Sequence, residues 1–345
     1  MKRILHAFLV LLGIVLLVFL MFQGLGDPDR MVVGQTGDQK TLEHIRKELN
    51  LDKPVWKQVL LYLNDVSPIG VYQQEEIESK GIKGLFAGGE TKVGLKLPYL
   101  GKSYQTRRPV GEMLLQVLPA TIILAVASML FAILFGVMLG VLAAVKKGTW
   151  IDTSTVITSV AGISAPSFFM AILVAYIFGI VLQPYTGLNF SGSLYEIDQV
   201  TGQPELHLKN LILPAFTLGI RPLAIICQLT RSAMLDELSK DYVRTAYAKG
   251  LSKSRVIFSH ALPNALNPVI TIITGWFAEL LAGAFFVEYI FGWNGIGKVT
   301  VNALEKLDYP VVMGSVLISA CLFLLISLFT DMLYRWVDPR VRGAN

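Results

Sequence analysis

The chain has 345 residues, of which 53% are hydrophobic and only 16% are charged. Soluble globular proteins carry about 25% charged residues, so the composition argues against an ordinary soluble enzyme. The two cysteines, Cys227 and Cys321, are too few and too far apart for a disulfide scaffold or a paired-cysteine metal site. The net charge of +5 could suggest nucleic-acid binding, but the placement of the basic residues decides its meaning. The apolar residues form long blocks, and this pattern predicts an all-α integral membrane protein.

Six blocks are long and apolar enough to form transmembrane helices, because a bilayer core needs about 20 apolar residues in a helix. No Asp, Glu, Lys or Arg lies within 4–22, 113–145 or 309–330. The fourth block is interrupted only by Arg221 and the fifth only by Glu279. The predicted helices are approximately 4–22, 117–145, 154–182, 211–230, 265–287 and 310–334.

The first block has a second interpretation as a cleaved signal peptide. Lys2 and Arg3 precede it, and the small-residue pattern Gly24-Leu25-Gly26 follows it. Its apolar run is longer than the about 7–15 residues of a signal-peptide core. We therefore expect the block to remain in the protein as the first transmembrane helix.

The distribution of Lys and Arg among the short loops predicts the orientation in the membrane. Basic residues concentrate near the N-terminus, in the loop 231–263 and in the tail 335–345, whereas the loops 183–209 and 288–309 hold few. Long segments such as 23–112 cross largely regardless of charge. Both termini are therefore predicted inside and 23–112 outside, and the positive charge reflects topology, so no nucleic-acid partner is expected. The predicted domains are the first helix 1–22, the extracytoplasmic segment 23–112, the transmembrane core 113–334 with the cytoplasmic loop 231–263, and the tail 335–345.

No enzyme or cofactor motif stands out. The segment from Gly292 to Lys298 matches part of a phosphate-binding loop, but Val299 stands where that loop needs Ser or Thr to bind magnesium. The segment also follows a membrane helix, so a Gly-rich turn in an outer helix hairpin is the better interpretation. The four histidines lie in different segments, and no metal site is expected.

The predicted cytoplasmic loop contains helix-forming sequence on both sides of Gly250. Gly250 suits the left-handed conformation that ends a helix, and Pro263 suits the start of the next one. We therefore expect a short helix, a turn and a second helix on the cytoplasmic face. Two roles fit this pattern: a basic amphipathic helix resting on anionic lipid, or a helix docked in a groove of a cytoplasmic partner.

This loop resembles the EAA motif of the permeases of binding-protein-dependent ABC importers, written EAA-x3-G-x9-I-x-LP. Aligned on Gly250, the chain keeps Ala246, Leu262 and Pro263 at the required spacing. The departures from the motif are Arg244, Thr245 and His260. With these departures the segment DYVRTAYAKGL is similar to the form DYVRTARAKGL of the dipeptide/oligopeptide/nickel subfamily.

Further segments resemble the same subfamily along nearly the whole chain. They are Gly26-Asp27-Pro28, Leu49 to Pro54 with Gln58 and Tyr62, Arg108-Pro109-Val110, Leu118 to Thr121, Gly148 to Asp152, Ser164 to Phe168 and Asp338 to Arg342. The exception is about 64–99, which we expect to be an insertion on the outer face.

The resemblance implies an ABC type I importer-like permease with a cytoplasmic coupling helix. Its implied partners are a second, homologous permease subunit, two cytoplasmic ABC ATPase subunits, an extracytoplasmic solute-binding protein and the lipid bilayer. ATP and magnesium would bind the ATPase subunits and no cofactor would bind this chain, a non-catalytic transport subunit of a bacterial or archaeal cytoplasmic membrane.

The coupling residues that the resemblance implies lie in and after the helix before Gly250. They are Asp241, Tyr242, Arg244, Thr245, Ala246, Lys249, Gly250, Leu251, Leu262 and Pro263. We expect Tyr242, Ala246 and Leu251 to provide apolar contact with an ATPase. The expected charged rim consists of Arg244, Lys249 and Lys253.

Two charged residues, Arg221 and Glu279, lie within predicted membrane helices. A charge at the centre of a membrane helix costs about 2.5–3.5 kcal/mol on insertion scales, so it usually faces a partner or a wet cavity. Three interpretations remain open: an ion pair between them, contact with the charged termini of a peptide in the translocation pathway, and snorkelling. Pro222 is expected to weaken the helix beside Arg221.

Within the importer class, di- or oligopeptides are the expected substrates, and nickel or another small solute is the alternative. A different class, an ion-coupled secondary transporter, would need a relay of carboxylates, for which Glu279 alone is thin support. It would also leave the loop 231–263 unexplained. A membrane-anchored enzyme or receptor would use 23–112 as a domain, but that segment shows no cysteine, no run of regular strands and no catalytic signature.

Overall fold

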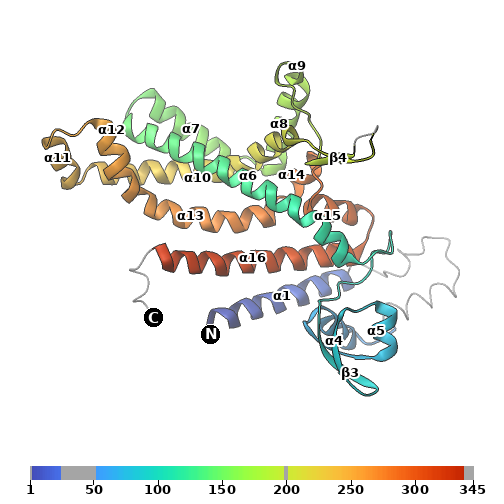
Figure 1. Cartoon of the computed structure of the whole chain (residues 1–345). Coiled ribbons are helices and arrows are strands. Elements are labelled where there is room, and N and C mark those ends of the chain that lie inside the picture. The colour runs from blue at the N-terminus through green and yellow to red at the C-terminus, as the bar shows by residue number, and fades with distance from the viewer. Residues whose placement is uncertain (1, 25–51, 198–200, 338–345) are drawn as a thin grey trace. The chain divides into compact units, whose positions relative to one another are not determined.

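The computed structural model describes residues 2–24, 52–197 and 201–337 (Figure 1). Of the segments that resemble the family, 26–28 and 338–342 lie outside these residues, as do residues 49–51 of the segment Leu49 to Pro54. The chain is mostly helical and divides into two compact units. One unit comprises Met1–Leu118 with Val299–Cys321, and the other Pro119–Lys298 with Leu322–Asn345.

The first unit combines helices with a small antiparallel sheet. Its N-terminal elements are α1 (Lys2–Gly24), α4 (Val55–Val66), β1 (Ile69–Gln73), α5 (Gln74–Lys80), β2 (Gly84–Gly88) and β3 (Thr91–Lys96). The strand order is β1-β3-β2, and α4 and α5 both pack on β1. The expectation of an all-α chain is therefore wrong in 64–99. The strands are short, and they contain Gly70, Gly84 and Gly94. Because glycine is depleted in strands, these residues weaken the strand signal in the sequence.

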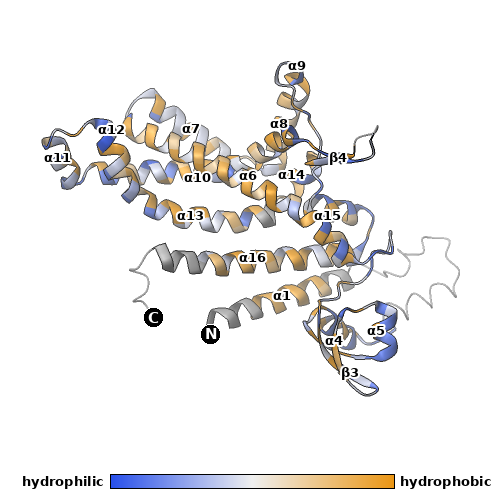
Figure 2. Cartoon of the chain, viewed as in Figure 1, coloured by the Kyte–Doolittle hydropathy of each residue, from blue (hydrophilic) through white to orange (hydrophobic). Residues whose placement is uncertain are grey.

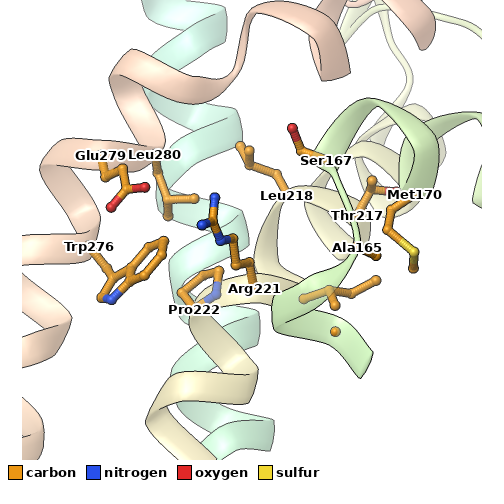
Figure 3. Close-up of a pocket in the computed structure, with 12 residues that line it drawn as sticks. Ala165, Ser167, Met170, Thr217, Leu218, Arg221, Pro222, Trp276, Glu279 and Leu280 are labelled. Atoms are coloured by element: carbon orange, nitrogen blue, oxygen red, sulfur yellow. The ribbon is translucent and has the colours of Figure 1, made fainter. Parts of the chain in front are cut away.

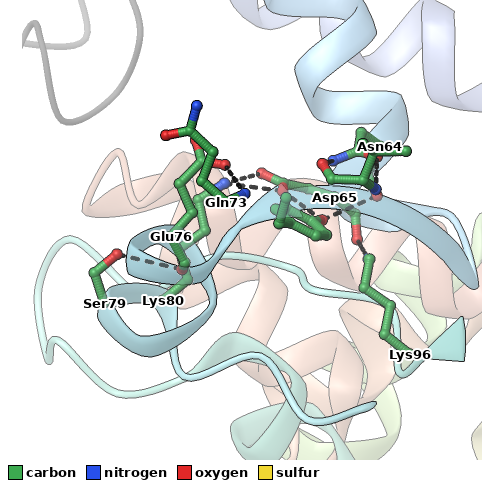
Figure 4. A network of polar contacts seen from close by, with 9 residues as sticks. Asn64, Asp65, Gln73, Glu76, Ser79, Lys80 and Lys96 are labelled. Carbon is green, nitrogen blue, oxygen red and sulfur yellow. Dashed lines mark hydrogen bonds and ion pairs between the residues drawn. The ribbon is translucent and has the colours of Figure 1, made fainter. Parts of the chain in front are cut away.

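A polar network under this sheet joins α4, β1, α5 and β3 (Figure 4). The Asp65 carboxylate accepts hydrogen bonds from the buried Tyr72 hydroxyl at 2.9 Å and from Lys80 Nζ at 2.9 and 3.0 Å. The buried Lys96 amine donates to the backbone carbonyl of Asp65. Buried polar groups are costly unless they are paired. These contacts therefore explain how a sheet of three short strands can hold the buried Lys96 side chain beneath it.

A second anchor of the first unit lies just before α16 (Tyr309–Val337). The buried Asp308 carboxylate accepts hydrogen bonds from Ser103 Oγ at 2.5 Å and from the backbone N–H of Tyr104 at 2.9 Å. A carboxylate bound by several donors fixes a loop more strongly than neutral contacts do. The segment that leads into α6 (Val110–Val145) is thereby held to the start of α16.

The second unit contains the long apolar helices around α10 (Ile212–Leu238). Before α10 come α7 (Trp150–Ser164), α8 (Ser167–Tyr176), the π-helical η1 (Ile177–Val181), α9 (Gln183–Thr186), the ribbon β4 (Tyr195–Ile197) and β5 (Pro204–Leu206), and the short η2 (Leu208–Leu211). After it come α11 (Asp241–Ala248), α12 (Lys253–Arg255), the π-helical η3 (Val256–Ala261), α13 (Leu262–Gly283), α14 (Phe285–Ile290) and the start of α15 (Ile296–Glu305). α10 contacts α7, α8 and α13.

Among the described residues, four helices are long and apolar enough to span a membrane. They comprise α6, η2 with α10, the run from α12 into α13, and α16, and Figure 2 shows their apolar surfaces. α7 and the α8–η1 run would together make a fifth span, although they bend by 111° at the break. α1 carries a shorter apolar stretch, Leu9–Leu20.

The fifth predicted helix and the loop after it differ from expectation in detail. Helical structure begins at Lys253 and runs through Pro263, so Pro263 lies inside a continuous helical run and does not start it. A proline ring crowds the preceding turn, and the wider π-helical turn of η3 lies directly before Pro263. The expected outer loop 288–309 holds the second half of α14 and all of α15.

Candidate translocation and coupling sites

A pocket of about 100 Å³ opens where α10, α13 and the break between α7 and α8 meet (Figure 3). Glu279 and Trp276 come from α13, Arg221 comes from α10, and Ala165 and Ser167 come from the break. Figure 3 shows Trp276 and Glu279 on one side of the pocket, with the Arg221 side chain between them and the α8 residues. The two charged residues predicted from the sequence therefore share one cavity.

The Arg221 guanidinium lies over the Trp276 indole, 5.5 Å from the ring centroid. Cation–π contact of this kind stabilises a cation by about 0.5–2 kcal/mol, depending on how far it is removed from water. Within the described part of the chain no ion pair joins Arg221 to Glu279, and both residues are exposed on the surface of the chain. The two charges therefore remain available to a ligand. Pro222 is buried, and α10 continues through it without interruption.

The short helix expected before Gly250 is α11, and its C-terminal end is well defined. Gly250 has φ +78°, its N–H bonds to the Tyr247 carbonyl, and the Leu251 N–H bonds to the Ala246 carbonyl. These two bonds form a Schellman motif, in which a glycine in the left-handed region ends a helix. Leu251 packs on the cluster that contains Ala246, as the motif usually requires. The predicted turn at Gly250 is confirmed.

The buried and exposed faces of α11 identify the surface that a partner can contact. Val243 and Ala246 are buried against Val256 of η3, so Ala246 packs within the chain itself. Tyr242 and Tyr247 are 38% and 43% exposed. The exposed polar side chains of the segment are Asp241, Arg244, Thr245 and Lys249. Sequence reasoning missed Tyr247, which a helical wheel drawn with Ala246 on the buried face would have identified.

The Tyr242 hydroxyl connects α11 to two membrane helices. It donates a hydrogen bond to Glu237 Oε2 near the end of α10 at 2.6 Å and accepts one from Asn264 Nδ2 in the first turn of α13 at 3.3 Å. Asn264 Nδ2 also bonds the His260 carbonyl at 3.0 Å. Burial raises the pKa of Tyr242, so the hydroxyl keeps the proton that it donates. Lys240 Nζ lies 2.6 Å from Glu237 Oε1 and completes the corner.

Leu262 and Pro263, also predicted to belong to the coupling segment, lie in the first turn of α13. Leu262 packs on the cluster that contains Val141, Met234 and Ala261. Leu262 thereby holds the base of α13 against α6 and α10, whereas Pro263 is exposed. Both residues precede Asn264 in sequence. The predicted coupling residues are thus brought together around one corner, some as its exposed surface and others as its support.

A buried carboxylate that the sequence did not indicate lies on α14. Glu288 is completely buried, and its Oε2 accepts a hydrogen bond from the Gly297 N–H at 2.6 Å. Its Oε1 has no hydrogen-bond partner among the described residues. A side chain at Gly295 would come within 2.4 Å of the carboxylate. The Gly-rich segment that resembled a phosphate-binding loop therefore encloses the chain's own carboxylate.

This carboxylate has an unusual ionisation equilibrium because water is excluded from it. Glu288 lies beyond the span Lys253–Leu280, and burial raises the pKa of its carboxyl to about 7. The neighbouring Phe291 and Trp293 are also fully buried, and Trp293 Nε1 donates to the Ala120 carbonyl at 2.9 Å. No group of three or more His, Cys, Asp or Glu residues in the described ranges is arranged to hold a metal ion.

Comparison with known proteins identifies the family. The model of the binding-protein-dependent transport system inner membrane component matches residues 136–343, and the N-terminal model of the same membrane component matches 1–125. The chain is 38% identical to a di/tripeptide transport system permease of Pseudomonas aeruginosa, over 96% of this chain and 94% of that one. It is 34% identical to a dipeptide transport system permease of Alkalihalophilus pseudofirmus, over 99% and 98%.

A relative with another named substrate is a glutathione transport system permease of Escherichia coli, 33% identical over 99% of this chain and 97% of that one. Among solved structures, the inward-facing MetNI methionine ABC transporter matches with a TM-score of 0.51 and 18% identity, over 66% of this chain and 96% of the matched chain. That likeness concerns the fold. The family models and the full-length relatives together show that this chain belongs to the inner-membrane components of binding-protein-dependent transport systems.

Proposed function

We propose that this chain forms half of the translocation pathway of an ATP-driven importer of di- or oligopeptides. Members of its family are permease subunits and are not themselves catalytic. The named substrates of the relatives are dipeptides, di- or tripeptides and glutathione. These molecules are small and have charged ends. The small pocket on α10 and α13, lined by Arg221 and Glu279, suits both features.

The proposed topology has six spans with both termini in the cytoplasm. α1 supplies the first span, and the bent pair of α7 with α8–η1 supplies the third. The basic loop around α11 then lies in the cytoplasm, as the positive-inside rule requires, and 23–112 lies outside. The chain would reside in the cytoplasmic membrane of a bacterium or archaeon.

The observation that carries the proposal is the joint at Tyr242. One hydroxyl group holds α11 to the end of α10 and to the start of α13, and these same two helices carry Arg221, Trp276 and Glu279 in the pocket. A partner that moves α11 would act on both walls of the pocket at once. Such a partner can shift the pocket between two states only by making different contacts with α11 in each.

The proposed partner at α11 is a cytoplasmic ABC ATPase. Tyr247 and Tyr242 offer apolar surface, and Arg244 and Lys249 provide a charged rim, as helix-in-groove recognition requires. Two such ATPases would bind ATP and magnesium, while a second, homologous permease would form the other half of the pathway. A solute-binding protein on the opposite face would deliver the substrate.

The pocket itself would hold one end of a peptide. Pockets for whole drug-sized ligands measure about 300–1,000 Å³, so about 100 Å³ suits a terminus better than an entire molecule. Arg221 would attract the peptide carboxylate and Glu279 the amino group. Among the described residues, Arg221 contacts the Trp276 ring and makes no ion pair with Glu279, which leaves both charges available to the peptide.

Two alternatives make different demands. A nickel or small-solute importer would keep α11 and its ATPase but would use the pocket differently, since neither Arg221 nor Trp276 is a metal ligand. An ion-coupled secondary transporter would have no cytoplasmic ATPase, and the exposed aromatic face of α11 would then have no role.

A crosslinking experiment tests the proposal. Ala246 is buried, whereas the side chain of Arg244 is 79% exposed. Arg244→Cys is therefore a better probe of the intact complex than Ala246→Cys. We expect a specific crosslink to an ATPase subunit that depends on assembly. Lys147→Cys, exposed in the connection between α6 and α7, is the control and should give none. A complex in which Arg244→Cys stays freely accessible to thiol reagents would refute docking at α11 and favour the secondary transporter.

A further inference from the structure

One face of the sheet β1-β3-β2 is covered by exposed aliphatic side chains. Strand register places Ile69, Leu95 and Leu85 in one cross-strand row, with exposures of 60%, 63% and 83%. The next row contains Val71 and Val93, at 50% and 51%, with exposed Ala87. Exposed apolar patches of this continuity mark interaction surfaces.

No charged residue interrupts these two rows. The charged residues of β3 alternate to the opposite face, where Lys96 is buried above Asp65 and the Lys92 amine bonds the Gln74 side chain. The alternation follows from the period of two in a strand. Charge within the sheet is thus directed inward and the aliphatic face is left uncovered, which is the reverse of the usual arrangement in a soluble domain.

The apolar character of the face falls along the strands. The row nearest to α4 in sequence contains Ile and Leu residues, the second row contains Val and Ala, and the third pairs Gln73 with Thr91. From Leu95 to Thr91 the strand advances about 13 Å at about 3.3 Å per residue. A gradient from large aliphatic to polar side chains over this length matches the change from acyl chains to headgroups in one leaflet.

The contacts of α4 place this sheet beside a membrane helix. The Tyr62 ring on α4 lies 5.7 Å from the Phe19 ring on α1, centroid to centroid. Phe19 is five residues before the end of α1 at Gly24, or about 7.5 Å at about 1.5 Å per residue. α4 therefore packs at the depth where α1 leaves the bilayer, and the described side chains Leu17 and Leu20 beside this contact are themselves exposed at 58% and 57%.

The exposed surface of α4 has the same character. Trp56 is 64% exposed, and Val55 and Leu60 are 44% and 56% exposed. Tryptophan is enriched at the boundary between membrane and water, where its ring lies among the headgroups. α1 contacts α4, and α4 contacts β1 of the sheet. The lipid-facing surface of α1 and the exposed apolar side chains of α4 and the sheet therefore belong to neighbouring elements.

We propose that the aliphatic face formed by Ile69, Leu85, Leu95, Val71, Val93 and Ala87 lies in the lipid leaflet at the C-terminal end of α1. The small sheet then acts as a monotopic anchor beside the first membrane helix, and the row of Leu85 lies deepest. The occupant of the face is lipid and not a protein, because the face is purely aliphatic, is graded along its length and belongs to a sheet whose neighbour α4 packs on α1. This inference depends only on α1 being a membrane helix.

Depth-dependent fluorescence quenching tests the proposal in the full-length protein. Single cysteines at Leu85, Val71 and Thr91, in a background with both native cysteines replaced, are labelled with a polarity-sensitive fluorophore. The protein is placed in nanodiscs of phosphatidylethanolamine and phosphatidylglycerol. We expect the Leu85→Cys label to be quenched by lipids with a nitroxide on the acyl chain and protected from aqueous iodide. The Val71→Cys label should follow, and the Thr91→Cys label should respond mainly to a headgroup nitroxide.

Glu75→Cys is the matched control, because Glu75 is exposed on α5 away from the aliphatic face and its label should be open to iodide. Leu85 is 83% exposed, so replacing it removes no packing. If the Leu85→Cys label behaves like the Glu75→Cys label, the proposal is wrong. It is equally wrong if protection at Leu85 arises only after purified solute-binding protein is added, since that result would assign the face to a protein partner.

Discussion

The Tyr242 hydroxyl donates a hydrogen bond to the Glu237 carboxylate across the corner between α10 and α11, at 2.6 Å. The same hydroxyl accepts a hydrogen bond from Asn264 on α13. One side chain therefore joins the exposed short helix to both walls of the pocket. Because a hydrogen bond to a charged group is stronger than one between neutral groups, this contact is stronger than the one from Asn264.

Removing that hydroxyl is expected to uncouple the two sites. Tyr242→Phe keeps the ring and its packing but loses the bonds to Glu237 and Asn264, at a cost of about 1.5–3 kcal/mol. In proteoliposomes with the partner subunits, we expect peptide uptake to fall severalfold while ATP hydrolysis persists. Tyr247→Phe is the control, since the Tyr247 hydroxyl makes no hydrogen bond within the described part of the chain. Equal uptake by Tyr242→Phe and wild type would show that the corner does not transmit movement.

The turn after α11 requires a glycine. At φ +78° a residue with a Cβ is strained by roughly 1–2 kcal/mol, although the space around Gly250 is open. Gly250→Ala should therefore displace the end of α11 and weaken co-purification of the ATPase subunits severalfold. Gly111→Ala, in open space in the first turn of α6, should leave co-purification unchanged. Normal assembly of the Gly250→Ala complex would show that the turn tolerates distortion.

Sequence patterns predicted the features that depend on local chemistry. Long apolar blocks indicated the spanning helices, and Gly250 indicated the end of α11 because one residue's backbone preference decides such a turn. Patterns did not predict the sheet within 64–99, because its strands are short and contain several glycines, which are depleted in strands. They also did not predict the burial of Glu288. A charged residue in so short a helix has the sequence signature of an exposed loop, and only tertiary packing removes Glu288 from water.

The pocket illustrates the same division. The cost of a charge in a membrane helix predicted that Arg221 and Glu279 would each face a partner or a wet cavity. The contact of Arg221 with the Trp276 ring and the bend of 111° between α7 and α8 could not be predicted, because both depend on how separate helices pack. The sequence alone therefore does not distinguish an aromatic partner for Arg221 from a carboxylate partner.

The charges of the pocket should set which peptides are carried. Arg221→Gln removes the cation proposed to attract a peptide carboxylate, so uptake of an unmodified dipeptide should fall about tenfold, as for the loss of about 1.4 kcal/mol. Uptake of a C-terminally amidated peptide should be low in wild type and unchanged in the variant. The measurement is competition between radiolabelled and unlabelled peptides in reconstituted complex.

A charge exchange distinguishes this role from a structural ion pair. If Arg221 and Glu279 act mainly on each other, the double variant Arg221→Glu with Glu279→Arg should restore assembly that each single variant loses. We expect instead that the single variants assemble and that the double variant remains defective in transport. Restored transport in the double variant would contradict the proposed contact with the termini.

Glu288 should make stability depend on pH. Its folded pKa of about 7 is above the ordinary glutamate value, so the folded state holds the proton more tightly than the unfolded chain does. The stabilisation is therefore complete below the ordinary pKa and is lost as pH rises through about 7, at roughly 1.4 kcal/mol per unit of pKa difference. Thermal unfolding in detergent should show a falling midpoint over this range.

Glu288→Gln is the informative variant for that measurement, because it keeps the shape and the acceptor for the Gly297 N–H but cannot ionise. Its unfolding midpoint should vary less between acid and neutral pH than that of wild type. Glu76→Gln, on the exposed helix α5, should leave the wild-type slope intact. A slope that survives in Glu288→Gln would assign the pH dependence to another group.

The ion pair between Asp152 and Arg231 should stabilise the packing of α7 on α10. Arg231 Nε and one terminal nitrogen lie 2.5 and 2.9 Å from the two Asp152 oxygens, and the Asp152 side chain is only 7% exposed. Breaking a buried pair costs about 3–5 kcal/mol because the remaining charge is left without a partner. Arg231 is 27% exposed, so Asp152→Asn should cost somewhat less and still lower the unfolding midpoint measurably.

An exposed ion pair of the same chain provides the comparison for Asp152→Asn. Glu112 lies 3.3 Å from Lys83, with side-chain exposures of 54% and 77%, and surface pairs of this kind contribute about 0–1 kcal/mol. Glu112→Gln should therefore leave the midpoint almost unchanged. Because both variants exchange one carboxylate for an amide, a difference between them measures burial and bidentate geometry. Equal midpoints would mean that water reaches Asp152 in the assembled protein and that α7 is held to α10 by apolar packing alone.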